Sequence, residues 1–264
     1  MISIVQSKED DLVFRRIIAL LCTLVLLLSA STSLAEGFSV EVSSQTDAQR
    51  LVRGYDADEG YIYINYGRYP YEADGTIAPV LWRVLGVSED GWALLLTEYV
   101  IDFAMYNTEK VNIYEWKGNT IYHTLNDDMR KVMFTDEELT AVRYSEEKGW
   151  LYYLDNEDYR NTAYGFRHWQ LKPQKERECK PTPYAMTHPD AWCDKSNGCT
   201  WYFSTGIPRR GYHNLIGFDG HTSTAANNRN GGVRCACKLD LSMLSNVSGS
   251  GTLEDPYSFD VVDE

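Results

Sequence analysis

Side chains that could bind a ligand gather in one stretch of the chain, between Gly198 and Leu241. The stretch mixes aromatic rings with Arg, Asn and Asp side chains, and its Gly- and Asn-rich segments predict loops and turns. Rings beside hydrogen-bonding groups in loops are typical of a carbohydrate or peptide site. A solvated hairpin surface with Trp201 in the core would give the same composition. The candidate ligand-binding residues are Trp201, Arg209, Arg210, Tyr212, His213, Asp219, His221, Asn227, Asn228 and Arg234.

The cysteines are the second group that could carry chemistry. Cys22 lies in an apolar N-terminal run, and five others follow it: Cys179, Cys193, Cys199, Cys235 and Cys237. In an exported protein this number favours disulfides with one thiol left over. Cys193 and Cys199 could close the short loop between them. Cys235 and Cys237 lie two apart on one predicted strand, with Cα atoms about 6.6 Å apart, near the limit for a bridge.

Two other interpretations of the cysteines stay open. Buried free thiols can act as small hydrophobic side chains, above all on the last predicted strand. A zinc site would need paired ligands at short spacing, and C-x5-C with C-x-C is not a usual set. A metal- or thiol-dependent enzyme would be built on Cys193, Cys199, Cys235 and Cys237.

Known catalytic motifs are missing from the sequence. The five histidines have no H-E-x-x-H or other ligand spacing: His123, His168, His188, His213 and His221. Ser204 lacks the flanking residues of a nucleophile elbow. There is no phosphate loop or dinucleotide fingerprint, and the acidic turn Asp56–Gly60 has its glycine in the wrong place for a calcium loop. We therefore expect no cofactor and no metal.

The first 35 residues have the order of a secretory signal. Arg15 and Arg16 precede the apolar run Ile17–Ala30, and Ser33-Leu34-Ala35 places small residues before a cut at Glu36. The run is shorter than the roughly 20 residues that span a bilayer. We expect a secreted or cell-surface protein without a membrane span in the mature chain; an uncleaved anchor is the alternative.

The net charge of −13 limits the choice of partners. An acidic surface repels phosphate backbones, so nucleic acid and anionic membranes are not expected as partners. The chain after the signal is long enough for one large or two small domains with a substantial core.

Hydrophobic patterns predict a mixed fold. Strands are expected at Tyr61–Gly67, Val80–Val87 and Trp92–Thr97, and the last two should form a hairpin. A helix is expected at Thr120–Met133. A second short helix should run to about Val142, because Thr135 and Glu138 have the spacing of a capping box.

The remaining segments are less regular. Tyr144–Gln174 predicts an irregular insertion with one possible strand at Trp150–Leu154, and Val233–Leu241 predicts a closing strand with Cys235 and Cys237 on its apolar face. Residues 36–60 are expected to be a linker or a loosely packed segment, and residues 242–264 a polar acidic tail.

Several short motifs occur in an order that is similar to a known family. They are Tyr66-Gly67-Arg68-Tyr69-Pro70, Leu81-Trp82-Arg83-Val84-Leu85, Cys179-Lys180-Pro181-Thr182-Pro183-Tyr184-Ala185, Thr200-Trp201-Tyr202-Phe203-Ser204 and Gly232-Val233-Arg234. Together they resemble the bacterial family known as domain of unknown function 6273. That family looks related to the formylglycine-generating-enzyme branch of the C-type-lectin-like folds, in which a G-F-R strand closes the domain.

Two departures limit what the resemblance implies. Arg234-Cys235-Ala236-Cys237 stands where the family usually has R-P-A-L, and Phe203-Ser204 where L-R-S is usual. The enzyme branch also has a copper-binding C-x4-C pair, and residues 203–212 contain no cysteine. The resemblance therefore implies a fold and an exported setting, and the oxidase activity is not expected.

These observations lead to one set of expectations. The fold should be α+β and C-type-lectin-like, a single loop-rich domain at residues 61–241 with short antiparallel strands and two helices. The first hypothesis is a non-catalytic surface or secreted module that binds a glycan or a surface peptide. The alternatives are a cysteine- or metal-dependent enzyme and a structural interaction domain of a surface assembly.

Overall fold

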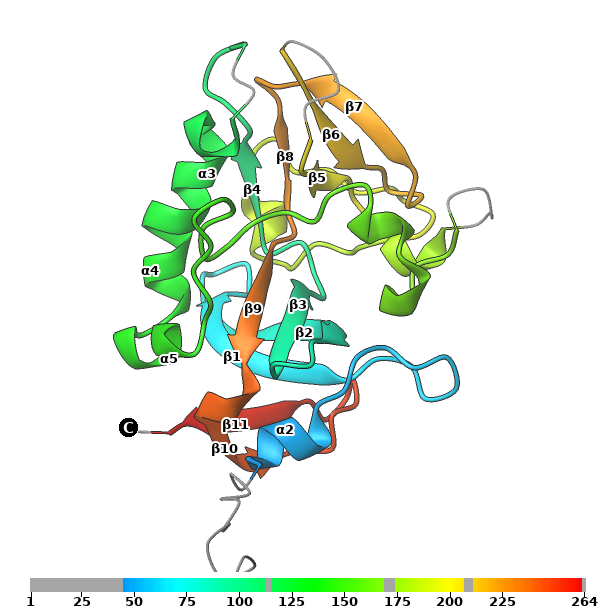
Figure 1. Cartoon of the computed structure of the whole chain (residues 1–264). Helices are drawn as coiled ribbons and strands as arrows, with labels where there is room; N and C mark the ends of the chain where they lie inside the picture. Colours follow the sequence, from blue (N-terminus) through cyan, green and yellow to red (C-terminus); the bar gives the residue numbers. More distant parts are fainter. Residues whose placement is uncertain (1–44, 113–114, 169–173, 207–210, 263–264) are drawn as a thin grey trace, which may run out of the picture. The chain divides into compact units, whose positions relative to one another are not determined.

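The computed structural model describes residues 45–112, 115–168, 174–206 and 211–262 (Figure 1). The expected signal segment, together with Arg209 and Arg210, lies outside these residues. The described residues form an α+β fold of two sheets with a few short helices. Within them, no helix has both the length and the apolar character needed to cross a membrane.

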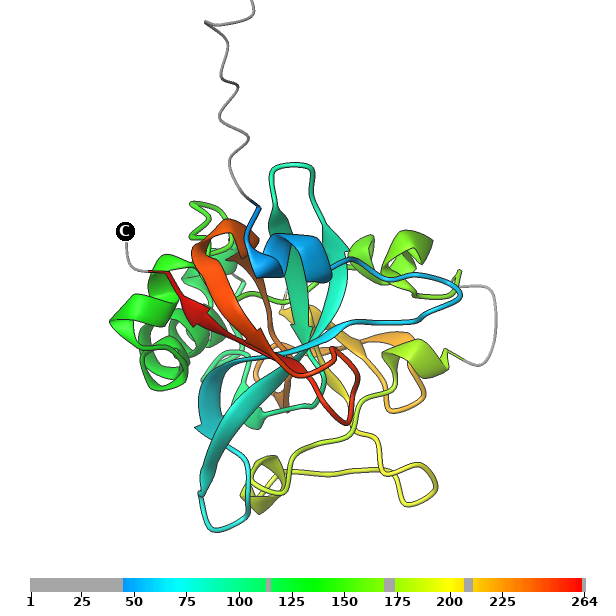
Figure 2. The same ribbon diagram turned by 90° about the horizontal axis from the view of Figure 1, so that it is seen from below.

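The larger sheet contains six strands in the order β10-β11-β1-β2-β3-β9. Their bounds are β1 Tyr63–Pro70, β2 Ile77–Val87, β3 Trp92–Thr97, β9 Ala236–Asp240, β10 Leu244–Ser248 and β11 Tyr257–Val261. The pairing of β1 with β11 is parallel, with Ile64 opposite Tyr257, and the other neighbours are antiparallel. Figure 2 shows β10 and β11 lying beside β1, so the first and last strands of the described fold are neighbours.

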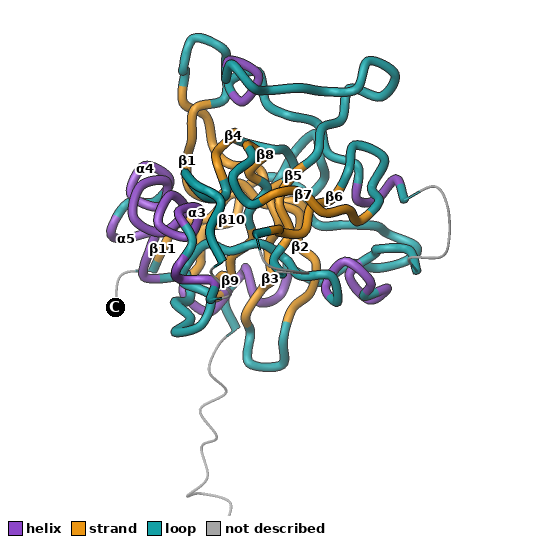
Figure 3. The backbone as a smooth tube through the Cα atoms, turned by 90° about the horizontal axis from the view of Figure 1, so that it is seen from above, coloured by secondary structure: helices purple, strands orange, loops and turns teal. Residues whose placement is uncertain are grey.

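The smaller sheet contains five strands in the order β4-β8-β5-β6-β7. Their bounds are β4 Asp102–Met105, β5 Tyr202–Ser204, β6 Tyr212–Ile216, β7 Thr222–Ala226 and β8 Asn230–Val233. This sheet occupies the upper half of the domain in Figure 1. Since its strands are short, much of this half is loop (Figure 3).

The predicted helices are confirmed, with one irregularity. Residues 120–133 are helical as α3 Thr120–His123, a π-helical turn Thr124–Met129 and α4 Arg130–Met133. The short helix α5 Asp136–Thr140 follows, and Thr135 and Glu138 cap it as expected. A helix α2 Asp47–Leu51 precedes the first strand. Short 3₁₀ turns occur at Trp116–Gly118, Asp158–Arg160, Thr162–Tyr164, Lys175–Arg177, Ala185–Thr187 and Leu241–Met243.

The predicted closing strand is divided between the two sheets. Residues 230–233 form β8 in the smaller sheet and residues 236–240 form β9 in the larger one, so the chain crosses between sheets at Arg234-Cys235. Arg234 is fully buried there, and its guanidinium donates to the Thr97 carbonyl at 2.9 Å and the Tyr202 hydroxyl at 3.0 Å. The residue thereby ties β3 of one sheet to β5 of the other.

Three local expectations were wrong. Residues 150–154 make an isolated bridge instead of a strand: the amides of Tyr152 and Ala236 each donate to the other's carbonyl, at 3.0 and 2.7 Å, and the pairing extends no further along the segment. The expected polar tail contains β10 and β11, whose inner side chains Tyr257, Phe259 and Val261 pack on the core. The expected linker contains α2, in which Ala48 is buried. The hydroxyl of Thr46, the N-cap of α2, donates to the Leu241 carbonyl.

Candidate ligand groove

The structure does not bring the predicted ligand-binding residues to one surface. Asp219 and His221 lie in the turn between β6 and β7, whereas Tyr212 and Asn227 lie at the other ends of those two strands. Asn228 is exposed. The Trp201 ring is half-buried, with its edge against the Phe203 ring at 6.3 Å between centroids.

Three of the predicted residues are buried and support the fold. Asn227 donates to the Val111 carbonyl at 2.7 Å, which holds the loop after β4. His213 is fully buried and stacks on Tyr106, with ring centroids 4.5 Å apart and an interplanar angle of 5°. Arg234 is fully buried at the crossing between the sheets. None of these three side chains is exposed to a ligand in solution.

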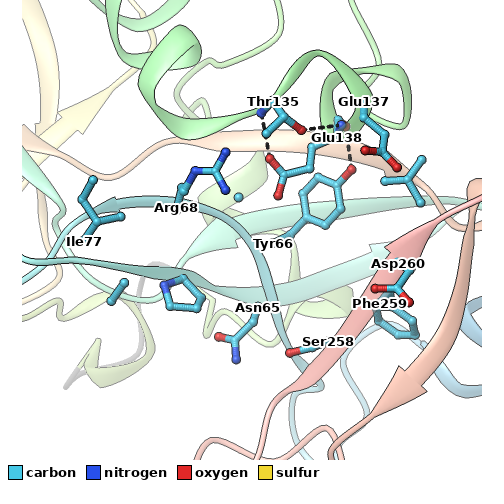
Figure 4. Close-up of a pocket in the computed structure, with 14 residues that line it drawn as sticks. Asn65, Tyr66, Arg68, Ile77, Thr135, Glu137, Glu138, Ser258, Phe259 and Asp260 are labelled. Atoms are coloured by element: carbon cyan, nitrogen blue, oxygen red, sulfur yellow. Dashed lines mark hydrogen bonds between the residues drawn. The ribbon is translucent and has the colours of Figure 1, made fainter.

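A groove elsewhere in the domain has the shape of a binding site. It has a volume of about 610 Å³ and lies between β1, the start of β2, α5 and β11 (Figure 4). Its lining residues are Asn65, Tyr66, Gly67, Arg68, Ile77, Ala78, Pro79, Thr135, Glu137, Glu138, Ser258, Phe259, Asp260 and Val261. Protein sites for small or extended ligands commonly have volumes of ~300–1,000 Å³.

A β-bulge in β1 creates the floor of the groove. Asn65 pairs with Leu81 and Arg68 with Pro79, so Tyr66 and Gly67 together face a single residue of β2. Gly67 has φ +65°, a left-handed conformation that glycine adopts without a steric penalty. A bulge of this kind bends its strand. Pairing of β1 with β11 stops where the bulge begins, after Asn65 and Ser258.

The capped end of α5 forms one wall. The Thr135 hydroxyl accepts from the Glu138 amide at 3.1 Å, and the Glu138 carboxylate accepts from the Thr135 amide at 2.7 Å. The Tyr66 hydroxyl donates to the Glu138 carbonyl at 2.5 Å, which fixes the wall to the floor. Burial raises the pKa of Tyr66 well above its usual value, and the nearby Glu138 adds to the effect, so the hydroxyl stays protonated as a donor.

The edge of β11 forms the opposite wall. Beyond Ser258 this strand pairs with β10 on one side only, with Asp260 opposite Ser245 and Val261 opposite Leu244. The side toward the groove has no partner strand in the described chain.

Acidic groups dominate the mouth of the groove. Glu137 on α5 and Asp260 on β11 are exposed on opposite walls, and Figure 4 shows Glu137 above Asp260. Glu138 adds a third carboxylate, already engaged in the helix cap. Arg68 is the basic lining residue and is exposed.

A second polar cluster connects β1, β4 and the turn after residue 187. The His188 Nε2 atom lies 2.6 Å from one Asp102 carboxylate oxygen, and the Tyr69 hydroxyl donates to the other at 2.6 Å. Among the described residues, no hydroxyl or thiol is hydrogen-bonded to the His188 ring. A histidine oriented by a carboxylate needs a nucleophile or a bound substrate within reach to act in catalysis. The geometry supports a structural tie between these segments.

The cysteines do not form a reactive centre in the described chain. All five described cysteines are free, including Cys193 and Cys199, for which a bridge across their short loop was one of the interpretations left open. Cys235, between β8 and β9, and Cys237, within β9, are both buried in the core. Burial raises the pKa of Cys235 to about 12 and that of Cys237 well above its usual value. Burial likewise raises the pKa of Cys179 to about 11.

No group of three or more His, Cys, Asp or Glu residues able to hold a metal ion occurs within the described ranges. The cluster of four cysteines that a metal- or thiol-dependent enzyme would need is not assembled.

The residues of the groove were missed in the sequence. Two signals pointed to it: a glycine inside a strong strand pattern often marks a bulge, and Tyr257–Val261 alternates apolar and polar residues as a strand does. Comparisons with family models, with curated proteins and with solved structures find no match to this chain.

Proposed function

We propose that this chain is an exported, non-catalytic binding module whose ligand occupies the groove between β1, β11 and α5. The ligand class is that expected from the sequence, a surface peptide or a glycan. The observation that carries the proposal is the groove itself, which is large, lined by polar and apolar side chains together, and fixed on regular elements.

The rigidity of the walls supports a binding role. The floor is tied to α5 by the hydrogen bond from Tyr66 to Glu138, and Gly67 packs so closely under α4 that an added Cβ would lie 2.7 Å from the Met133 carbonyl oxygen. A preformed site needs little ordering when the ligand binds, which favours affinity.

The C-type-lectin-like fold and the exported location belong to the same proposal. The fold part of this proposal rests on the sequence resemblance that includes Gly232-Val233-Arg234. The N-terminal segment with the order of a secretory signal supports export. Immunodetection of the chain in medium and membrane fractions of expressing cells tests the location.

The enzyme hypothesis has weaker support. A thiol nucleophile or metal ligand must lose its proton, and burial holds Cys235 and Cys237 in the protonated form at neutral pH. A structural interaction domain remains the nearest alternative, and it would use the same groove for a permanent partner.

A binding screen tests the proposal. The purified chain is applied to a displayed peptide library and to a glycan array, and the hits are measured again with a Ser258→Trp variant. The indole should fill the groove beside Asn65 and weaken binding at least tenfold, whereas the control Ser258→Ala should bind within twofold of the wild type. Hits that bind the Ser258→Trp variant unchanged, or no hits on either screen, would overturn the proposal.

A further inference from the structure

We infer that the groove takes an extended segment of a cationic partner protein, which adds a strand to the open edge of β11. This inference rests on the proposed function and specifies its ligand class. It follows from three features of the described chain: an unpaired strand edge, a bulge that keeps the edge open, and carboxylates on both sides of the opening.

The open edge can form backbone hydrogen bonds. The amide of Val262 donates to the Met243 carbonyl at 2.8 Å, and Asp260 pairs with Ser245, so these residues turn their backbone groups toward β10. Consecutive residues of a strand turn their N–H and C=O groups to opposite sides. Val261 lies between Asp260 and Val262, so its N–H and C=O groups face the groove. An edge with unpaired groups is a template for an added strand.

The bulge prevents the molecule from closing this edge itself. Parallel pairing with β1 ends at Asn65 and Ser258, and the bulge that contains the left-handed Gly67 follows directly in β1. The space opened in this way is the groove. A strand lying there would continue the sheet between β11 and the wall formed by α5.

The electrostatics of the opening select a cationic strand. Glu137 on α5 and Asp260 on β11 are both exposed, and Asp260 also accepts a hydrogen bond from Asn246 at 3.2 Å. Side chains of a bound strand point alternately to its two faces. Lys or Arg at alternate positions would therefore reach these carboxylates while the intervening residues pack near Phe259 and Ile77.

Charge also argues against a second copy of this chain as the occupant. Each chain carries a net charge of −13, so two copies repel one another at moderate ionic strength. A glycan would fill the volume but would not pair in strand fashion with the open backbone groups of Val261. The edge and the charge together favour a basic peptide strand.

Synthetic peptides of one length test the inference. Three nine-residue peptides alternate Val or Thr with Lys, Gln or Glu, and a fourth is the Lys peptide with alternate backbone amides N-methylated. Fluorescence anisotropy with the full purified chain at low ionic strength measures each Kd. We expect the Lys peptide to bind at least tenfold more tightly than the Glu peptide, with the preference falling severalfold in 0.5 M salt since screening weakens exposed charge pairs. N-methylation should cost at least tenfold, because the methylated edge cannot pair.

Matched variants locate the contacts. Glu137→Gln with Asp260→Asn should weaken the Lys peptide about tenfold, whereas the exposed but distant Glu157→Gln should leave it unchanged. Val261→Pro removes the groove-facing amide and should weaken binding more than Val261→Ala. Thermal unfolding of each variant shows whether the fold is retained.

The outcomes separate this inference from the proposed function. Tight binding of the Lys peptide that is lost on N-methylation and in the double variant supports it. The Ser258→Trp variant can lose binding of the ligands found in the screen and so confirm the groove as a binding site. If the Lys, Gln and Glu peptides then bind with equal affinity, or if N-methylation does not weaken binding, the inference is refuted. If no ligand is sensitive to Ser258→Trp, both fail.

Discussion

Stability in mild acid should depend on one buried histidine, His213. Its ring is enclosed by Tyr106 and Phe203, and within the described chain neither of its ring nitrogens has a hydrogen-bond partner. Burial lowers the pKa of His213 from 6.5 to about 4, since the charged ring would lose its hydration without gaining a partner. In the unfolded chain the same ring takes up a proton near pH 6.5.

The difference between the folded and unfolded pKa of His213 sets the direction and the size of the pH effect on stability. At pH 7.5 and above the ring is almost entirely neutral in both states and contributes almost no pH dependence. Between pH 6.5 and 4 the unfolded state binds a proton at this ring and the folded state does not, so the free energy of unfolding falls as the pH falls. From pH 7.5 to 5.0 the loss attributable to His213 is about 2 kcal/mol.

Urea unfolding followed by tryptophan fluorescence, at pH 7.5, 6.5, 5.5 and 5.0, measures the effect against a His213→Phe variant. The Phe ring keeps the stack on Tyr106 and cannot be protonated, and the other four histidines are present in both proteins. The wild type should lose about 2 kcal/mol more than the variant over this range. Parallel stability curves, or an NMR titration that places the His213 pKa above 6, would refute the reasoning.

Four further predictions concern stability and thiol chemistry. Thr135→Ala removes the α5 cap and should lower the free energy of unfolding by ~1 kcal/mol, measured from the urea midpoint. Arg234→Met leaves the Thr97 carbonyl and the Tyr202 hydroxyl without the donor that they share, and the same assay should show a loss of ~2–4 kcal/mol. A loss below ~1 kcal/mol would contradict the tie between the sheets. Gly67→Ala should destabilise by more than ~1 kcal/mol because an added Cβ meets the Met133 carbonyl, whereas Gly75→Ala, also at positive φ but in open space, should cost less. In native protein, a thiol reagent should label the half-buried Cys193 first, and the fully buried Cys235 only after unfolding; equal labelling rates would show that the core opens readily.

Local patterns were enough to predict the regular elements. The hairpin of β2 and β3 was predicted because its apolar runs and its Gly-containing turn act over a few residues. The helix from Thr120 and the capping box at Thr135 were predicted for the same reason, and both are confirmed. Hydrophobic period and capping chemistry are local properties of a sequence.

The division of the closing strand between two sheets was not predictable from such patterns. Both Cys235 and Ala236 are buried, and alternation cannot tell a strand that is covered on both faces from one that changes sheet. The burial of Arg234 and His213 was missed for a related reason. Polar residue types indicate exposure on average, and their burial here depends on partners such as Thr97, Tyr202 and Tyr106 that are far away in the sequence.

The groove was missed because its walls come from three distant parts of the chain. Tyr66, Glu138 and Asp260 meet only when β11 is laid beside β1, and that pairing is a property of the topology. The polar composition of residues 242–264 as a whole suggested a tail, and it outweighed the short alternation of Tyr257, Phe259 and Val261 with Ser258 and Asp260.

The parallel contact between Ile64 and Tyr257 joins positions almost two hundred residues apart, and this has a kinetic consequence. Contacts between such remote positions form slowly, because a long loop must close before they contribute any stability. During synthesis β1 leaves the ribosome well before β11, and until then its Ile64–Asn65 edge has no partner strand on that side. A chain stopped before Tyr257 would therefore carry an exposed edge next to apolar core residues, and in cells it should be a substrate for chaperones and proteases.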